Sequence, residues 1–185
     1  QFFLAVSKAG GRGITKRDTV AGSFSDWAVA TDRNYTALVK SPQWACIYGT
    51  ADHRGAAATD GLFLLTGLAS ASATVTRADN VGTGAPTLVD VRDVGVAVVS
   101  GVEYVYVVVG NATGVDSEAG VWECAVSHDP SDGGFVAATH LTWRKVFSVE
   151  TSTDRPQSIC IHQAAANSAP RAYLGNYRIF NVPTP

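Results

Sequence analysis

Five side chains in the middle of the chain have the clearest capacity for chemistry. His128, Asp129 and Asp132 lie in a polar loop that also contains proline, serine and glycine, and Asp116 and Glu118 lie in the loop before it. Carboxylate oxygens are the ligands that Ca²⁺ prefers, so a calcium ion could bridge the two loops. The spacing matches no calcium-binding loop, and two ordinary solvated loops are the alternative. We therefore expect these five residues to form a binding surface that requires no cofactor.

Other polar groups offer weaker sites. Asp52-His53-Arg54 could bind an anion or transfer a proton, because histidine titrates near neutral pH, although a solvated loop explains the triplet equally well. Cys160 and His162 alternate along an expected strand and point to one face, but they supply two ligands where a zinc site needs four. We expect no metal site. The tryptophans could stack on sugar rings, but their apolar surroundings favour core packing: Trp27, Trp44, Trp122 and Trp143.

Sequence motifs of common enzymes are missing from the chain. It contains no G-x-S-x-G, H-E-x-x-H, P-loop or dinucleotide-binding pattern. We therefore assign no catalytic residue, while noting that groups gathered from distant loops leave no local pattern.

Cysteine pairing and N-glycosylation sequons are two features that depend on whether a protein is secreted. Three cysteines, Cys46, Cys124 and Cys160, cannot all pair within the chain, and each lies in an apolar stretch where a buried free thiol behaves as a small hydrophobe. One disulfide with one free thiol, and a reactive thiol, are the alternatives. The sequons at Asn34 and Asn111 would carry glycans in a secreted protein.

The composition indicates a compact body. The chain has 185 residues, of which 46% are hydrophobic and 16% charged, so it is long enough for one domain, residues 1–185, with a substantial core. A formal net charge of -2 provides no positive field for nucleic acid. No apolar run is long enough to span a membrane. Because the chain begins with Gln1 and contains no methionine, we expect it to be processed or part of a longer parent chain.

Short β-type runs separated by polar turns extend along the whole chain. The clearest organisation is an antiparallel meander of three strands, Glu103–Val109, Val121–Ser127 and His140–Ser148. We expect a loop over Ser7–Ser23. Further strands are expected at Phe2–Val6, Asp26–Thr31, Tyr35–Lys40, Gln43–Gly49, Gly61–Gly67, Ala71–Arg77, Thr87–Val91, Gly95–Val99, Ser158–His162 and Arg171–Phe180. About a dozen short antiparallel strands without helical periodicity predict an all-β fold, either a propeller-like assembly or a sandwich.

Three consecutive segments resemble strands of the sialidase and trans-sialidase superfamily of β-propellers: Pro86–Val91, Tyr104–Gly110 and Val121–Ser127. The family's Asp-box turn reads approximately S-x-D-x-G-x-T-W. Ser127-His128-Asp129 matches its start and Thr142-Trp143 its end, with Gly133 or Gly134 as the glycine, although the intervening segment is several residues too long.

This resemblance covers about the middle third of the chain and implies a structural turn, because the Asp-box carries no catalysis. Family sialidases use an arginine triad, a tyrosine nucleophile paired with a glutamate, and an aspartate acid at the centre of a six-bladed ring. A chain of this length holds roughly three or four blades of 40 to 50 residues. It cannot close such a ring alone, and no arginine has a context that singles it out.

Three functions follow from these features. We expect a non-catalytic module, extracellular or on the surface of a cell or particle, that binds glycans or other protein subunits and belongs to an oligomer or larger assembly. The first alternative is a structural subunit of a coat, shell or filament, including a viral one. The second is a fragment of a sialidase-like glycoside hydrolase.

Overall fold

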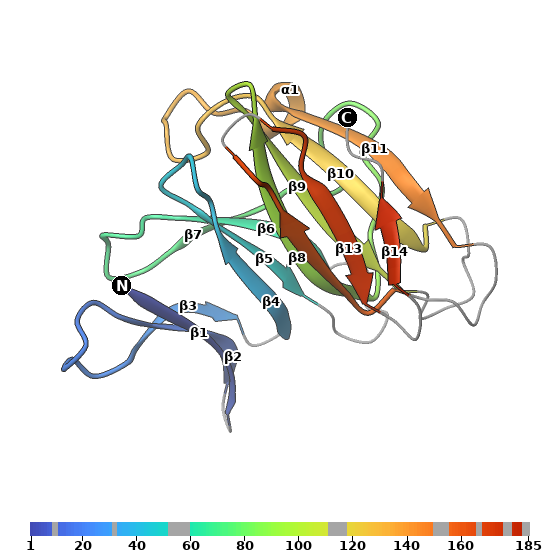
Figure 1. The fold of residues 1–185 in the computed structure, drawn as a ribbon. Coiled ribbons are helices and arrows are strands. Elements are labelled where there is room, and N and C mark those ends of the chain that lie inside the picture. The colour runs from blue at the N-terminus through green and yellow to red at the C-terminus, as the bar shows by residue number, and fades with distance from the viewer. Residues whose placement is uncertain are drawn as a thin grey trace.

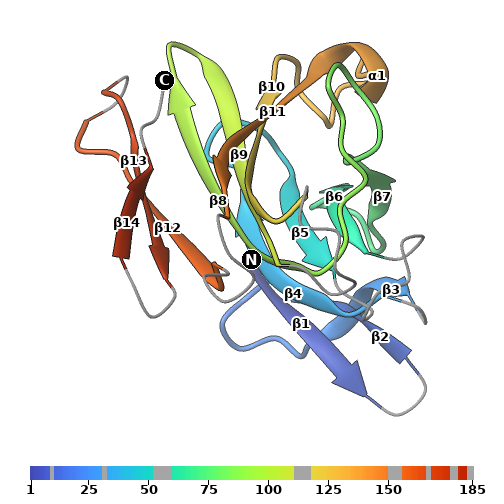
Figure 2. The same cartoon turned by 90° about the vertical axis from the view of Figure 1, so that its right-hand side faces the viewer.

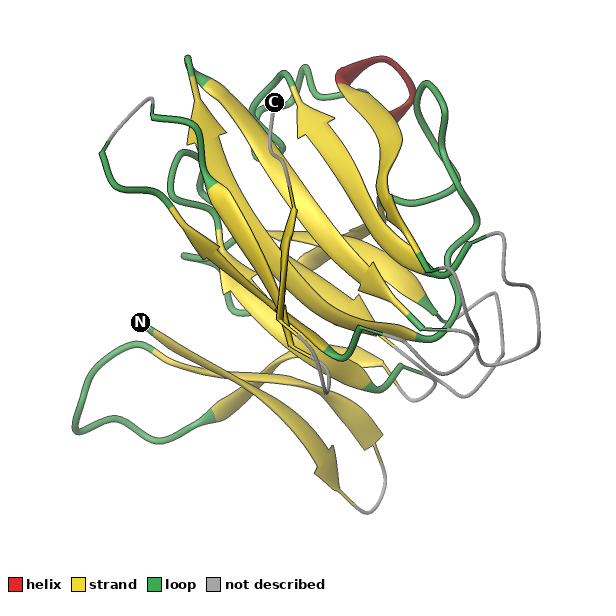
Figure 3. Ribbon diagram, turned by 45° about the vertical axis from the view of Figure 1, so that its right-hand side comes forward, coloured by secondary structure: helices red, strands yellow, loops and turns green. Residues whose placement is uncertain are grey.

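The structure is a computed structural model that describes residues 1–8, 11–30, 33–51, 60–110, 118–149, 156–165, 168–175 and 179–182. These residues contain fourteen β-strands and one helix, α1 (Ala137–His140), of four residues. Figure 3 shows how far strands dominate the molecule. The predicted all-β fold class is therefore confirmed. No helix of the described segments is long and apolar enough to cross a membrane.

The strands form four antiparallel sheets, and each sheet is built from strands that are consecutive in the chain. We number the sheets in chain order. The first contains β1 (Phe2–Lys8), β2 (Gly11–Arg17) and β3 (Ser25–Ala30); the second β4 (Tyr35–Lys40), β5 (Ile47–Ala51), β6 (Gly61–Thr66) and β7 (Thr74–Arg77); the third β8 (Val91–Val99), β9 (Val102–Val109), β10 (Gly120–Val126) and β11 (Leu141–Ser148); the fourth β12 (Ser158–His162), β13 (Arg171–Gly175) and β14 (Ile179–Val182).

The four sheets follow one another in space in the same order as in the chain. Figures 1 and 2 show this succession, from the blue first sheet to the red fourth sheet. Strand β8 contacts β4 and β5 on one side and β12 on the other, and β4 also contacts β1 and β2. The first strands of successive sheets therefore lie beside one another. Each sheet is open at both edges, so the described strands form no closed barrel.

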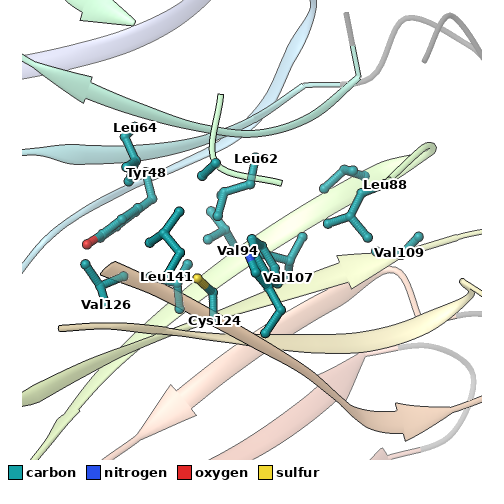
Figure 4. Close-up of a cluster of buried hydrophobic side chains, with 14 of the residues drawn as sticks. Tyr48, Leu62, Leu64, Leu88, Val94, Val107, Val109, Cys124, Val126 and Leu141 are labelled. Atoms are coloured by element: carbon teal, nitrogen blue, oxygen red, sulfur yellow. The ribbon is translucent and has the colours of Figure 1, made fainter. Parts of the chain in front are cut away.

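Apolar clusters fill the spaces between neighbouring sheets. The largest lies between the second and third sheets, where Tyr48, Leu62 and Leu64 meet Val107 and residues of β10 and β11 (Figure 4). Two smaller clusters lie between the first and second sheets and between the third and fourth. Strand β9 contributes side chains to two clusters, the one shared with the second sheet and the one shared with the fourth, because side chains alternate between the two faces of a strand. All residues of the run Val105–Val109 are consequently buried, as their continuous apolar character predicts.

The predicted meander is confirmed, since β9, β10 and β11 pair antiparallel in that order. The predicted loop over Ser7–Ser23 is wrong, because β2 lies within it and pairs with both β1 and β3. Polar residues of β2 tolerate burial where they find partners. The ammonium of Lys16 donates to the carbonyls of Leu68 at 3.1 Å and Ser70 at 2.8 Å.

Other predicted strands also differ in the structure. The strand predicted at Gln43–Gly49 is β5, which begins only at Ile47, and the strand predicted at Ala71–Arg77 is β7, which begins only at Thr74. Arg171–Phe180 is divided between β13 and β14 rather than continuous. Thr87–Val91 is irregular up to Asp90, which has a positive φ of 53°, and only Val91 belongs to a strand. Leu88 is nevertheless fully buried in the largest cluster. The apolar pattern of this segment thus reflects burial between two sheets and not a strand.

The connection between β7 and β8 is fixed to β11. Trp143 donates from its indole Nε1 to the Val81 carbonyl at 3.2 Å and from its backbone N to the Thr83 carbonyl at 2.8 Å. Gly82 has a φ of +100°, and a Cβ there would lie 2.4 Å from the Leu141 carbonyl oxygen. Only glycine permits this close approach.

Candidate functional site

Residues 127–140, which we call the 127–140 loop, connect β10 to β11 and contain three of the five predicted binding residues. The loop is shaped by its own aspartates. Asp129 Oδ1 accepts hydrogen bonds from the backbone N of Ser131 at 2.8 Å and from its hydroxyl at 2.7 Å. Asp132 Oδ1 accepts one from the backbone N of Gly134 at 3.2 Å. Such local bonds are typical of aspartate in turns, and they join neighbouring residues of the loop.

Three rings gather on this loop. The imidazoles of His128 and His140 stack with centroids 4.5 Å apart at 26°, and the Phe135 ring lies 5.6 Å from His140. His140 accepts a hydrogen bond at Nδ1 from the backbone N of Val136 at 2.8 Å, so its neutral form carries the proton on Nε2. His128 Nε2 lies 3.1 Å from Asp132 Oδ2, whose side chain is exposed. The loop thus brings two imidazole rings, a phenyl ring and an exposed carboxylate side by side, with the Nε2 atom of His128 buried.

The other two predicted binding residues do not join this group. Glu118 precedes β10, whereas His128 follows it, and a strand of seven residues separates them by about 20 Å. The backbone carbonyl of Glu118 accepts a hydrogen bond from the Trp122 indole at 3.0 Å. Burial lowers the pKa of the nearby Lys145 ammonium, and the charge of Glu118 opposes that shift. Asp116 lies outside the described residues.

The calcium bridge considered as a possibility from the sequence is therefore not assembled by Glu118. Among the described residues, no group of three histidine, cysteine, aspartate or glutamate side chains is placed to hold a metal ion. The Asp52-His53-Arg54 triplet lies outside the described residues.

A buried polar network between the second and third sheets was not predicted. The Glu103 carboxylate accepts hydrogen bonds from the Tyr48 hydroxyl and, at 2.6 Å, from the Ser41 hydroxyl. The Ser41 oxygen in turn accepts one from the backbone N of Trp44 at 2.6 Å. Glu103 and Tyr48 are 0% exposed. The only local signal for this network is one carboxylate in a strand of valines and tyrosines.

Burial decides the protonation of this network. It raises the pKa of the Glu103 carboxyl and the pKa of the Tyr48 hydroxyl, and it raises the pKa of the neighbouring Cys46 thiol to about 12. A thiol or phenol that stays protonated and is closed to solvent is not a nucleophile. The network therefore joins two sheets and is closed to solvent.

Three described arginines form ion pairs with carboxylates that stabilise the fold. Arg77 and Arg92 each form a two-point ion pair with an aspartate two residues away, Asp79 and Asp90, with Nη2 to Oδ2 distances of 2.7 Å. Asp79 also accepts hydrogen bonds from the backbone N atoms of Leu62 and Leu88, which anchors the connection before β8. Arg144 donates to the buried Glu123 at 2.6 Å, and this bond raises the pKa of the Arg144 guanidinium.

The cysteines are free thiols. Cys46 and Cys124 are buried, as predicted, but the burial predicted for Cys160 is wrong because its side chain is exposed on β12. Cys160 faces Tyr173, and His162 faces Arg171, in the register of β12 with β13. This pair remains two ligands short of a tetrahedral metal site.

Of the two predicted glycosylation sites, Asn34 precedes β4 and is half-buried, and Asn111 lies outside the described residues. Two of the four tryptophans, Trp27 and Trp143, are core residues, whereas Trp44 and Trp122 are half-buried.

No family model matches the chain, and no curated protein is significantly similar to it.

Proposed function

We propose that this chain is a non-catalytic binding and assembly module in which the four sheets are successive blades of a propeller-type array. Propeller blades are antiparallel meanders of consecutive strands, arranged so that the sheets pack on one another around a centre. Support comes from the four consecutive meanders and from the adjacency of β4, β8 and β12, the first strands of their sheets. The turn that resembles an Asp-box would then connect the last two strands of the third blade.

The 127–140 loop is the recognition element in this proposal, and carbohydrate is its ligand. One observation carries the assignment: His128 and His140 stack beside the exposed Asp132 on a loop that is already ordered by its own hydrogen bonds. Sugars present apolar ring faces for stacking and paired hydroxyls for carboxylate and imidazole groups. A preorganised loop loses little entropy when it binds. We place the module outside the cell or on a particle surface, where such ligands occur.

A glycan array probed with the full chain, followed by an NMR titration of each hit, tests this assignment. We expect saturable binding that the double variant His128→Ala/Asp132→Asn weakens at least tenfold, because two polar contacts are worth more than about 1.4 kcal/mol. The matched control is His162→Ala, an exposed histidine of the fourth sheet, which should bind as the wild type does. Absence of saturable binding, or unchanged binding by the double variant, refutes the carbohydrate assignment.

The second candidate is a structural subunit, and it is favoured by the open edges of the first and fourth sheets. The two inner sheets have four strands each, whereas the first and fourth have three, with β3 and β14 at an edge. An open edge can accept a strand from another chain. Sedimentation velocity over a hundredfold concentration range should then show reversible assembly. A monomer at all concentrations would reject this role and leave the carbohydrate assignment standing.

The hydrolase alternative has less support. Two tyrosine–glutamate pairs lie in the described part of the chain, Tyr48 with Glu103 and Tyr106 with Glu123, and both are buried, so no substrate can reach them in this structure.

A further inference from the structure

A cavity of about 320 Å³ lies between the first and second sheets, away from the 127–140 loop. It is lined by Gln1, Phe3, Leu38, Lys40 and Ile47. Its size lies at the lower end of the range of small-molecule sites, roughly 300 to 1,000 Å³. The cavity therefore has room for a compact ligand.

The cavity is lined by three apolar side chains, the polar Gln1 and the cationic Lys40. Phe3 of β1 and Leu38 of β4 are half-buried members of the cluster between the two sheets, and Ile47 of β5 is 2% exposed. Lys40 pairs with Ile47 in the register of β4 with β5 and lies two residues from Leu38, so the two side chains share a face of the strand. Lys40 is exposed and has no ion-pair partner in the described part of the chain.

Several contacts join the first sheet to the second. Lys16 and the Trp27 indole both donate to backbone carbonyls of the turn between β6 and β7, Trp27 to that of Gly67 at 3.3 Å. The Phe3 ring packs against Trp27, with centroids 4.9 Å apart. These bonds fix the position of the first sheet relative to the turn between β6 and β7.

We propose that this cavity binds a small amphipathic anion. Its apolar part lies against Phe3, Leu38 and Ile47, and its carboxylate or sulfonate meets the Lys40 ammonium. Burial of the apolar part supplies most of the affinity, and the ion pair selects anions over neutral molecules of the same shape.

The test is an NMR titration of the full chain with linear carboxylates of four to ten carbons and with the primary alcohols of the same lengths. Each added methylene should tighten binding about fourfold until the cavity is full, after which affinity should level off. Lys40→Gln should weaken carboxylate binding by roughly threefold and leave alcohol binding unchanged. Lys145→Gln, on the third sheet, is the matched control and should change neither.

Leu38→Trp fills the cavity and should abolish binding of both series. If that variant does not fold, Lys40→Glu at the exposed rim tests the charge without altering the packing, and carboxylates must then bind more weakly than alcohols do. The proposal is overturned if no carboxylate binds saturably, or if binding is insensitive to the Lys40 substitutions. Neither outcome affects the carbohydrate assignment, which rests on the third sheet.

Discussion

Replacement of Glu103 by glutamine should change how the stability of the protein depends on pH. Glu103 is 0% exposed and is held between the Ser41 and Tyr48 hydroxyls. Burial raises the pKa of its carboxyl above the ordinary value of 4.5. The folded state therefore binds a proton at this site more tightly than the unfolded state does.

This difference in proton binding sets the direction in which stability changes with pH. The stability contributed by protonated Glu103 is fully present below pH 4.5 and is lost as the pH rises through the raised pKa of the folded state. One titrating group changes the free energy of unfolding by at most about 1.4 kcal/mol per pH unit. Glutamine cannot ionise, so Glu103→Gln should gain stability relative to the wild type over this window. Below pH 4.5 the variant should be the less stable protein, since its amide NH₂ group faces hydroxyl donors.

Urea denaturation followed by tryptophan fluorescence at half-unit steps from pH 4 to pH 8 measures this difference. If the stability difference between the wild type and Glu103→Gln is constant over the whole range, the reasoning from burial is wrong.

Three further predictions concern stability and thiol chemistry. Asp79→Ala should destabilise the protein by about 3 to 5 kcal/mol in urea denaturation, because it leaves two backbone N–H groups and a guanidinium without their buried partner. Gly82→Ala should cost about 1 to 3 kcal/mol in the same assay because of its positive φ, whereas Gly133→Ala, with open space at its Cβ, should be nearly neutral. Cys160 alone should react with a thiol reagent in the native protein, and all three cysteines should react after unfolding; a native count of three would contradict the structure.

Predictions from local pattern succeeded where a strand is bounded by turn residues. Tyr35–Lys40 and Ser158–His162 were predicted with the bounds that β4 and β12 have. Strand propensity and turn chemistry act over a few residues, so they can be read from a short window of sequence.

Predictions that depended on distant partners did less well. Nothing near Lys16 in the chain indicates that its ammonium reaches carbonyls 52 and 54 residues away, and β2 was missed for that reason. Glu118 was grouped with His128 because the two loops belong to one meander. The structure places them at opposite ends of β10, because one loop enters the strand before Gly120 and the other leaves it after Val126. His140 was assigned to a strand, and its stacking with His128 depends on the path of the whole loop.

The sequence by itself determined that this protein is made of short β-strands, where most of them lie, and which loops carry polar side chains. Only the tertiary structure decided the order of the sheets in space and which polar groups are buried together. Tyr48 and Glu103 are 55 residues apart and meet only because the second and third sheets pack face to face. Backbone preference is a local property of the chain, whereas burial and pKa depend on neighbours that folding brings from elsewhere.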